Sequence, residues 1–180
     1  MTPLYDLGLD FFRNAESHGF WEKDGSPEPT KKAEKIALMQ PVIYLIGSLR
    51  NPEIPKIGAY LRELGFEVFD DWHAAGPEAD DWWQKYEKGR GHSYPEALRG
   101  YAARHVFSFD LHHLARADMG VLVLPAGKSG HLELGYLIGQ GKPGYVLFDK
   151  EPERFDVMYQ FAKGVYYDLR ELGSALSKSG

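Results

Sequence analysis

The stretch Val42-Ile43-Tyr44-Leu45-Ile46-Gly47-Ser48 decides the fold of this chain of 180 residues. Its first five residues are apolar or aromatic without alternation, and Gly-Ser ends the run. Such a pattern is typical of a strand that is buried on both faces, as strands are in parallel sheets covered by helices. We therefore expect residues 42–46 to form a central strand of an α/β domain.

Downstream of this strand, short apolar runs alternate with segments of helical spacing. Strands are predicted at 66–69, 119–124, 145–148 and 165–167, and helices at 54–64, 95–117, 131–139, 152–163 and after residue 168. Residues 70–93 are polar and aromatic, and no element is predicted there. Alternation with short connections indicates helices on both faces of a parallel sheet. The sequence predicts a flavodoxin-like, doubly wound parallel sheet of four or five strands.

The domain organisation follows from a change in composition near residue 40. Residues 22–35 are rich in proline and charge, as linkers are, and the apolar residues within 1–16 fit a short amphipathic helix. We therefore assign residues 1–40 to an N-terminal extension and residues 41–180 to the α/β domain.

Composition excludes several classes of protein. The chain has no cysteine, which excludes a disulfide scaffold, a thiolate-bound metal and a cysteine nucleophile. A net charge of −5 argues against a nucleic-acid polymer as partner. Acidic residues precede the first cation, unlike in a secretion signal, and the apolar run 121–126 is far shorter than the ~20 residues of a membrane span. We expect a cytoplasmic protein without a membrane partner.

Ligands of open parallel sheets bind beyond the carboxyl ends of the strands, so the residues that follow predicted strands are candidates. The candidates after the first two strands are Gly47, Ser48, Arg50, Asp71 and Trp72. Arg50 could hold a phosphate or carboxylate, or it could form a surface ion pair with Glu53. Trp72 could stack on a base, or it could belong to the core or to a subunit contact.

The third such segment runs from Pro125 into the predicted helix 131–139. Lys128-Ser129 suggests a phosphate-binding loop, but the glycine that the motif needs at position 122 is a leucine, so the motif fails. A glycine-rich turn into a helix N-terminus remains. Glu133 is expected in the first turn of that helix, either as an acid that stabilises the helix dipole or as an ionised carboxylate that can act as a nucleophile.

Asp110 lies in an apolar part of the predicted helix 95–117. It could be exposed or paired with Arg104 or Arg116, or it could be buried near Glu133 with a raised pKa and donate a proton. Three nearby histidines lack the spacing of metal ligands, because adjacent histidines point to different sides of a helix. No metal and no cofactor are expected.

Three pieces of the chain carry a family resemblance: Tyr44-Leu45-Ile46-Gly47-Ser48, Phe109-Asp110-Leu111 with Ala117-Asp118, and the stretch from Pro125 to Tyr136. Together they resemble the nucleoside 2-deoxyribosyltransferase family and its nucleotide N-hydrolase relatives. In the last piece, Ser129-Gly130 followed by Glu133-Leu134-Gly135-Tyr136 is similar to the family's nucleophile segment. The resemblance extends over residues 41–165, approximately.

This resemblance implies that Glu133 is the nucleophile that attacks C1′ of a deoxyribose, and that Asp110 assists departure of the base and helps to position the sugar. It implies a small-molecule nucleoside or nucleotide and a free nucleobase as partners, and a homo-oligomer in which a neighbouring subunit helps to close each site. The substrate contacts would fall on Gly47, Ser48, Arg50, Asp71, Trp72, Gly127, Ser129 and Gly130.

The expected function is therefore transfer of 2-deoxyribose between nucleobases through a covalent intermediate on the enzyme. Gly127 stands where transferases of the family often have an aspartate, and Ser48-Leu49-Arg50 is closer to the phosphate-gripping loop of the nucleotide hydrolases. One alternative is an N-glycosidase that hydrolyses deoxynucleosides or their 5′-monophosphates. A second alternative is a nucleotide-binding module without catalysis.

Overall fold

The structure, a computed structural model, describes residues 40–178. The helix and linker that the sequence predicts before residue 36 lie outside the described residues. None of the helices in the part of the chain that is described is long and apolar enough to cross a membrane.

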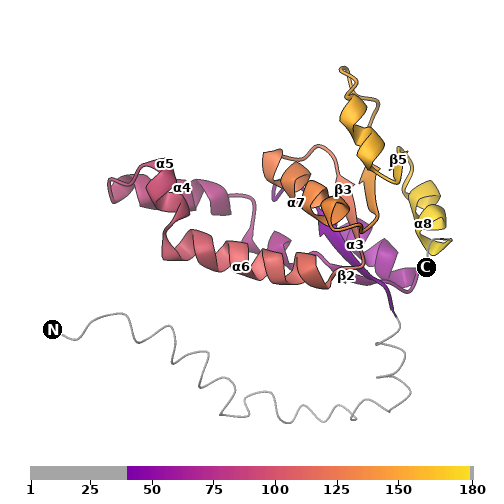
Figure 1. Cartoon of the computed structure of the whole chain (residues 1–180), viewed down its shortest axis with the longest axis horizontal. Helices are drawn as coiled ribbons and strands as arrows, with labels where there is room; N and C mark the ends of the chain where they lie inside the picture. Colours follow the sequence, from indigo (N-terminus) through magenta and orange to yellow (C-terminus); the bar gives the residue numbers. More distant parts are fainter. Residues whose placement is uncertain (1–39, 179–180) are drawn as a thin grey trace, which may run out of the picture. The chain divides into compact units, whose positions relative to one another are not determined.

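The described residues form one sheet of five parallel strands (Figure 1). The strands are β1 (Val42–Ile46), β2 (Glu67–Phe69), β3 (Met119–Val123), β4 (Gly144–Leu147) and β5 (Gly164–Tyr166). Their order is β2-β1-β3-β4-β5, and every neighbouring pair is parallel. This is the strand order of flavodoxin-like folds, so the predicted fold class is confirmed with five strands.

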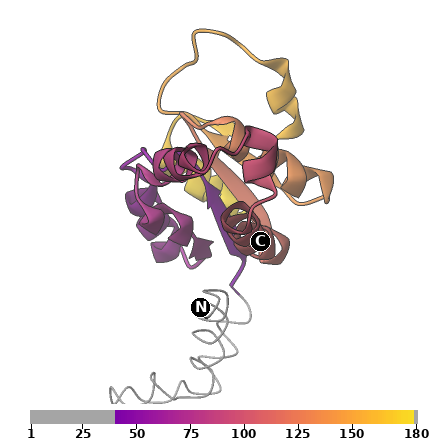
Figure 2. The same ribbon diagram turned by 90° about the vertical axis from the view of Figure 1, so that its left-hand side faces the viewer.

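Helices cover both faces of the sheet. The helices α3 (Ile54–Glu63) and α8 (Leu169–Ser177) contribute to the core on one face, and α6 (Tyr101–Arg116) and α7 (Lys128–Gly139) contribute to the core on the other. Figure 2 shows α3 and α7 on opposite sides of the strands. The sheet is therefore doubly wound, with two apolar layers.

β1 divides its side chains between the two layers. Ile43 and Leu45 are in the layer with α3, whereas Val42, Tyr44 and Ile46 are in the layer with α6 and α7. All five are buried, which explains why the apolar run shows no alternation.

The segment 70–93, for which no element is predicted, contains a 3-10 helix, η1 (Asp71–Ala75), and an α-helix, α4 (Ala79–Gly89). The buried residue of α4 is Glu87, whereas Trp82 and Tyr86 are 60% and 61% exposed. Ala79, Trp82, Trp83 and Tyr86 recur at helical spacing, so the sequence does carry a helical pattern here, but the aromatic face of this helix is largely exposed instead of packed in the core.

The helix predicted at 95–117 is wrong as one continuous element. The structure has α5 (Tyr94–Leu98), followed by α6 after a break at Gly100. Gly100 is the extended N-cap residue of α6, with φ −68° and ψ 161°. A capping box starts α5, in which the Ser93 N–H donates to Glu96 Oε2 at 2.8 Å.

The helix predicted at 152–163 is also wrong. A short 3-10 helix, η2 (Val157–Phe161), stands there instead, and Asp156 Oδ1 at its start accepts the N–H of Met158 at 2.9 Å. The segment between β4 and β5 arches away from the sheet (Figures 1 and 2). Phe155, with an exposed fraction of 81%, does not contribute to an apolar helix face here.

Candidate active site

Tyr44, Asp110 and Glu133 come together in the layer under α6 and α7. Tyr44 on β1 is buried, and its hydroxyl is hydrogen bonded to the carboxylate of Asp110 on α6. Burial, together with the charges of Glu133 and Asp110, raises the pKa of Tyr44 far above its usual range. The hydroxyl therefore keeps its proton and donates it to the hydrogen bond. A role for the Tyr44 hydroxyl could not be predicted from the sequence, because an aromatic residue within a buried strand is usually part of the core.

Glu133 lies in the second turn of α7, because the helix begins at Lys128, three residues before the predicted start. The prediction of Glu133 in the first turn is therefore wrong, and its charge does not meet the helix N-terminus directly. Burial, and then the charge of Asp110, raises the pKa of Glu133 to about 7. Glu133 is half-buried, and its carboxyl group is close enough to Asp110 to respond to its charge.

Asp110 is half-buried, and burial raises the pKa of its carboxyl group while the hydrogen bond from Tyr44 opposes the rise. The alternative pairings with arginine are wrong. Arg116 Nη1 lies 2.5 Å from Glu67 Oε1, and the Arg104 guanidinium lies over the ring of Tyr101 at 5.0 Å. Asp110 is directed to the sheet.

This arrangement can hold one proton between two carboxyl groups. Two acids that feel each other's charge in a buried site titrate as a pair, so one of them stays protonated while the other is ionised. An ionised carboxylate can attack an electrophilic carbon, and a protonated one can donate to a leaving group. Both capacities are present in Asp110 and Glu133.

The loop after β1 carries three of the predicted contact residues. A Cβ atom on Gly47 would lie 2.4 Å from Ile54 Cδ1, so a larger residue there would force the buried side chain of Ile54 to shift. Ser48 Oγ accepts the backbone N–H of Arg50 at 3.2 Å. Arg50 Nη2 lies 2.7 Å from Asp81 Oδ2 at the start of α4.

The predicted ion pair of Arg50 with Glu53 is therefore wrong. Glu53 Oε1 instead accepts from Lys56 Nζ at 2.7 Å. The contact of Arg50 with Asp81 depends on α4, a helix that the sequence did not predict.

Trp72 is fixed at the carboxyl end of β1. Its indole Nε1 donates to the carbonyl of Leu45 at 2.8 Å, and its ring packs against both apolar layers. Asp71 is exposed, and its charge acts on His113 of α6, which stacks on Phe69 at 3.7 Å. The structure thus brings Trp72 to the edge formed by the carboxyl ends of the strands, and it places Asp71 beside β2.

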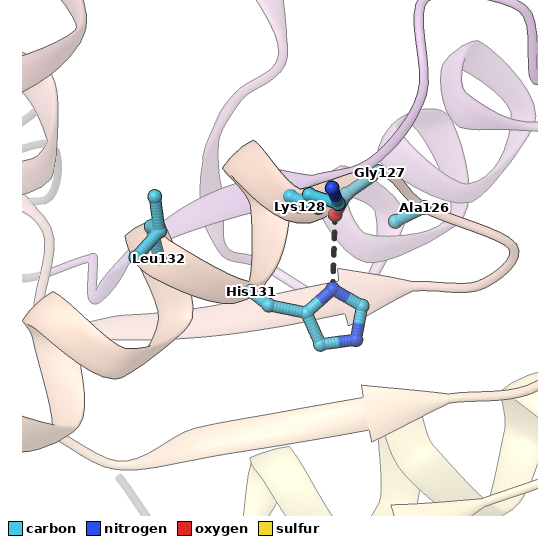
Figure 3. A pocket seen from close by; sticks show the side chains of 5 residues that line it. All are labelled: Ala126, Gly127, Lys128, His131 and Leu132. Carbon is cyan, nitrogen blue, oxygen red and sulfur yellow. Dashed lines mark hydrogen bonds between the residues drawn. The ribbon is translucent and has the colours of Figure 1, made fainter.

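The start of α7 contains the last three predicted contact residues. Gly127 is the exposed, extended N-cap residue, and Ser129 is also exposed. Gly130 is buried, and a Cβ atom there would lie 3.0 Å from Ile46 Cγ2. Ala126, Gly127, Lys128, His131 and Leu132 line a hollow of about 480 Å³ at this turn (Figure 3).

This hollow lies on a different flank of α7 from Glu133. Residues of an α-helix are 100° apart, so His131 and Glu133 point in directions roughly 160° apart. Within residues 40–178, no group of three or more acidic or histidine side chains could hold a metal ion.

Comparisons with known proteins give the fold. No family model matches the sequence, and no curated protein matches it. The structure is similar to that of a 2-deoxyribosyltransferase from the psychrotolerant bacterium Bacillus psychrosaccharolyticus, with a TM-score of 0.52 and 21% identity over 73% of this chain and 90% of that chain. It also matches a CMP N-glycosidase from Clostridium botulinum, with a TM-score of 0.45 and 15% identity over 75% of this chain and 97% of that chain. The resemblance stated from the sequence is thus confirmed as a likeness of fold to a 2-deoxyribosyltransferase.

Proposed function

We propose that the protein is a nucleoside 2-deoxyribosyltransferase that cleaves the N-glycosidic bond of a 2-deoxynucleoside and transfers the sugar to another nucleobase. The observation that carries this proposal is the cluster that the buried Tyr44 forms with the half-buried acids Asp110 and Glu133. A transferase of this kind needs one carboxylate that attacks and one acid that protonates the leaving group. The cluster supplies both groups at the carboxyl side of a doubly wound sheet.

In the first step, a carboxylate oxygen of Glu133 attacks C1′ as the bond from C1′ to the base nitrogen breaks. The electron pair of that bond goes to the base, and Asp110 donates a proton to it. The sugar is then held as an ester on Glu133. In the second step, the nitrogen of another base attacks C1′, Glu133 leaves as a carboxylate, and Asp110 takes up the proton of the incoming base. Two displacements at C1′ give net retention.

The reactive form of the site has its single proton on Asp110. Tyr44 stabilises the ionised Asp110 that remains once this proton has been donated to the base, because its hydroxyl donates to a carboxylate oxygen of Asp110. A 2-deoxy sugar lacks the electron-withdrawing 2′-hydroxyl, so positive charge at C1′ forms more readily than in a ribonucleoside. Two carboxyl groups are therefore sufficient for the proposed chemistry.

An apolar surface beside Asp110 suits a nucleobase. Val106 and Phe107 precede Asp110 by four and three residues, so all three lie on one side of α6. Val106 is 58% exposed and Phe107 is 64% exposed. A flat base that leaves the sugar beside Asp110 would cover these side chains and gain apolar and stacking contacts.

A second candidate function is hydrolysis of a deoxynucleoside 5′-monophosphate. The observation that favours it is the pairing of Arg50 with Asp81, in which the side chains are 53% and 71% exposed. An exposed pair of this kind contributes only about 0–1 kcal/mol. A phosphate could therefore replace Asp81 as the partner of Arg50, with Ser48 as a further donor.

We also propose that the protein is a homo-oligomer. Trp82, Tyr86 and Tyr94 on α4 and α5 are 60%, 61% and 69% exposed, and aromatic side chains are enriched at subunit interfaces. Light scattering at micromolar concentration should give a mass above that of one chain. A fully active monomer would contradict this proposal.

The function is tested by incubating the protein with deoxynucleosides and their 5′-monophosphates, with and without free bases, and separating the products by chromatography. A transferase gives a new deoxynucleoside only when a second base is present. Mass spectrometry of the quenched reaction should find a deoxyribosyl group on the peptide with Glu133, and Glu133→Ala should lose several orders of magnitude in turnover. Cleavage that continues in Glu133→Ala at more than a tenth of the original rate would exclude Glu133 as the nucleophile.

A further inference from the structure

The imidazole of His131 joins two segments that are distant in the sequence. Its Nδ1 lies 2.9 Å from the carbonyl oxygen of Gly127, as Figure 3 shows, and its Nε2 lies 2.9 Å from the hydroxyl of Tyr159 on η2. A carbonyl oxygen can only accept, so Nδ1 carries a proton and donates it. In the neutral ring, Nε2 is then an acceptor, and the Tyr159 hydroxyl is its donor.

Tyr159 is itself held in place from the sheet side. Its ring meets that of Phe148 edge-on, with the centroids 5.4 Å apart, and Phe148 is buried directly after β4. Tyr159 also packs against the apolar layer of α6 and α7. Burial, with the nearby charge of Asp156, raises the pKa of Tyr159, so its hydroxyl stays protonated as the geometry requires.

The contact adds a side-chain anchor at the N-cap end of a turn whose other end, Gly130, is buried against the core. Gly127 has no side chain to cap α7, and a Cβ atom on it would find only Ser129 Oγ, at 3.9 Å. The body of α7 is held differently, because Leu134 and Leu137 are buried in the layer under the helix. His131 therefore acts on the first turn of α7, whereas the core holds Glu133.

We propose that His131 and Tyr159 are positioning residues that fix the carbonyl of Gly127 and so set the geometry of the substrate-binding turn 127–130. The pair does not touch the reacting atoms, since His131 points away from the flank of α7 that carries Glu133. This role rests on the proposed function, in which Gly127, Ser129 and Gly130 contact the substrate. In this proposal, the η2 segment anchors the turn through the hydroxyl group of Tyr159.

The activity test compares Tyr159→Phe, His131→Ala and the double variant. Tyr159→Phe removes the hydroxyl and keeps the ring that packs on Phe148. A looser binding turn with the nucleophile in place should raise KM by about fivefold to tenfold and change kcat by less than about twofold. The double variant should resemble His131→Ala, because the two side chains act as one unit.

The control is Leu132→Ala, which changes an exposed neighbour in the same hollow and should leave KM unchanged. The proposal is overturned if kcat falls while KM stays constant, if KM is unchanged in Tyr159→Phe, or if the two single effects add.

A second test needs no activity. Nitrogen-15 NMR of the full chain should show the ring of His131, assigned by its loss in His131→Ala, with the proton on Nδ1. Tyr159→Phe should shift the Nε2 resonance, and amide exchange at Ser129 and Gly130 should become about tenfold faster. A proton on Nε2 alone would contradict the hydrogen bond between His131 and Tyr159. Unchanged amide exchange would contradict its effect on the turn. If these results hold while the wild type cleaves no nucleoside, the proposed function fails and the structural link stands.

Discussion

The hydroxyl of Tyr44 on β1 is hydrogen bonded to the carboxylate of Asp110 on α6. This bond ties the central strand to α6 across the apolar layer, and the charge of Glu133 acts on the same hydroxyl. Burial raises the pKa of Asp110, and the hydrogen bond from this buried strand residue opposes the rise. The electrostatics of the site thus depend on the sheet as much as on the two carboxyl groups.

Tyr44→Phe should reduce kcat by about tenfold to a hundredfold, because Asp110 loses the donor that stabilises the carboxylate formed when it gives its proton to the leaving base. The ring can keep its contact with Phe69, at 5.1 Å between centroids, so the fold should be retained. Steady-state kinetics and urea unfolding of the same variant measure the two effects.

The matched control for this variant is Tyr145→Phe on β4. Tyr145 is also buried, but its hydroxyl has no hydrogen-bond partner among the residues that the structure describes. Removing that hydroxyl should leave kcat unchanged and keep or increase the free energy of unfolding. If the two variants lose activity equally, the hydroxyl of Tyr44 has no specific role in catalysis.

Asp110→Asn should slow nucleosides with poor leaving groups much more than nucleosides with activated bases, because only the poor leaving groups need the proton. The pH dependence of kcat should change as well. In the wild type, kcat should fall above pH 7 as the shared proton is lost from the pair, whereas this fall should be absent in Asp110→Asn. An equal loss for both kinds of substrate would assign Asp110 a purely structural or positioning role.

Glu133→Gln should stabilise the protein more at pH 8 than at pH 4.5. The folded state raises the pKa of Glu133 to about 7, so it holds the proton more tightly than the unfolded chain does. The contribution to stability is complete below the ordinary glutamate pKa of about 4.3 and is lost as the pH rises through 7. Glutamine does not ionise, so the variant should gain about 1–3 kcal/mol over the wild type between these pH values.

Urea unfolding of both proteins at the two pH values measures this gain, and comparing the two proteins cancels the titration of all other groups. The same difference at pH 4.5 and at pH 8 would show that Glu133 titrates normally.

Arg50→Ala and Asp81→Ala distinguish the two candidate substrates. If Arg50 binds a 5′-phosphate, Arg50→Ala should lower kcat/KM for the monophosphate by about tenfold or more and leave the nucleoside unaffected. Asp81→Ala frees the guanidinium from its partner at 2.7 Å and should raise kcat/KM for the monophosphate. If neither variant changes the ratio of the two substrates, Arg50 is a surface residue and the nucleoside reaction is favoured.

The sequence predicted the sheet well, because each buried strand carries an apolar run that does not depend on its neighbours. It failed where structure depends on contacts between distant segments. α4 buries Glu87 against the start of α6, where a Cβ atom on Gly100 would lie 3.8 Å from Glu87 Oε1, and no apolar pattern reports such a contact. The start of α7 was placed three residues late because Lys128 and Ser129 resemble loop residues.

The candidate site was predictable in its acids and not in its supporting groups. Asp110 is conspicuous as a carboxylate within an apolar stretch, and the structure places it where its charge acts on Glu133. Their catalytic roles remain predictions. Tyr44 and His131 could not be assigned, since a tyrosine in a buried strand and a lone histidine in a helix have ordinary structural explanations. Only the folded arrangement shows what their polar atoms contact.

Trp72 has a consequence for how the domain unfolds. Its indole contacts both apolar layers and is tethered to the last part of β1. Loosening of either layer therefore exposes the same ring to water, and its fluorescence would report on both at once. Because one ring packs against both layers, we expect the two apolar layers to unfold together. The shared ring lies at the edge of the sheet where the substrate is expected to enter.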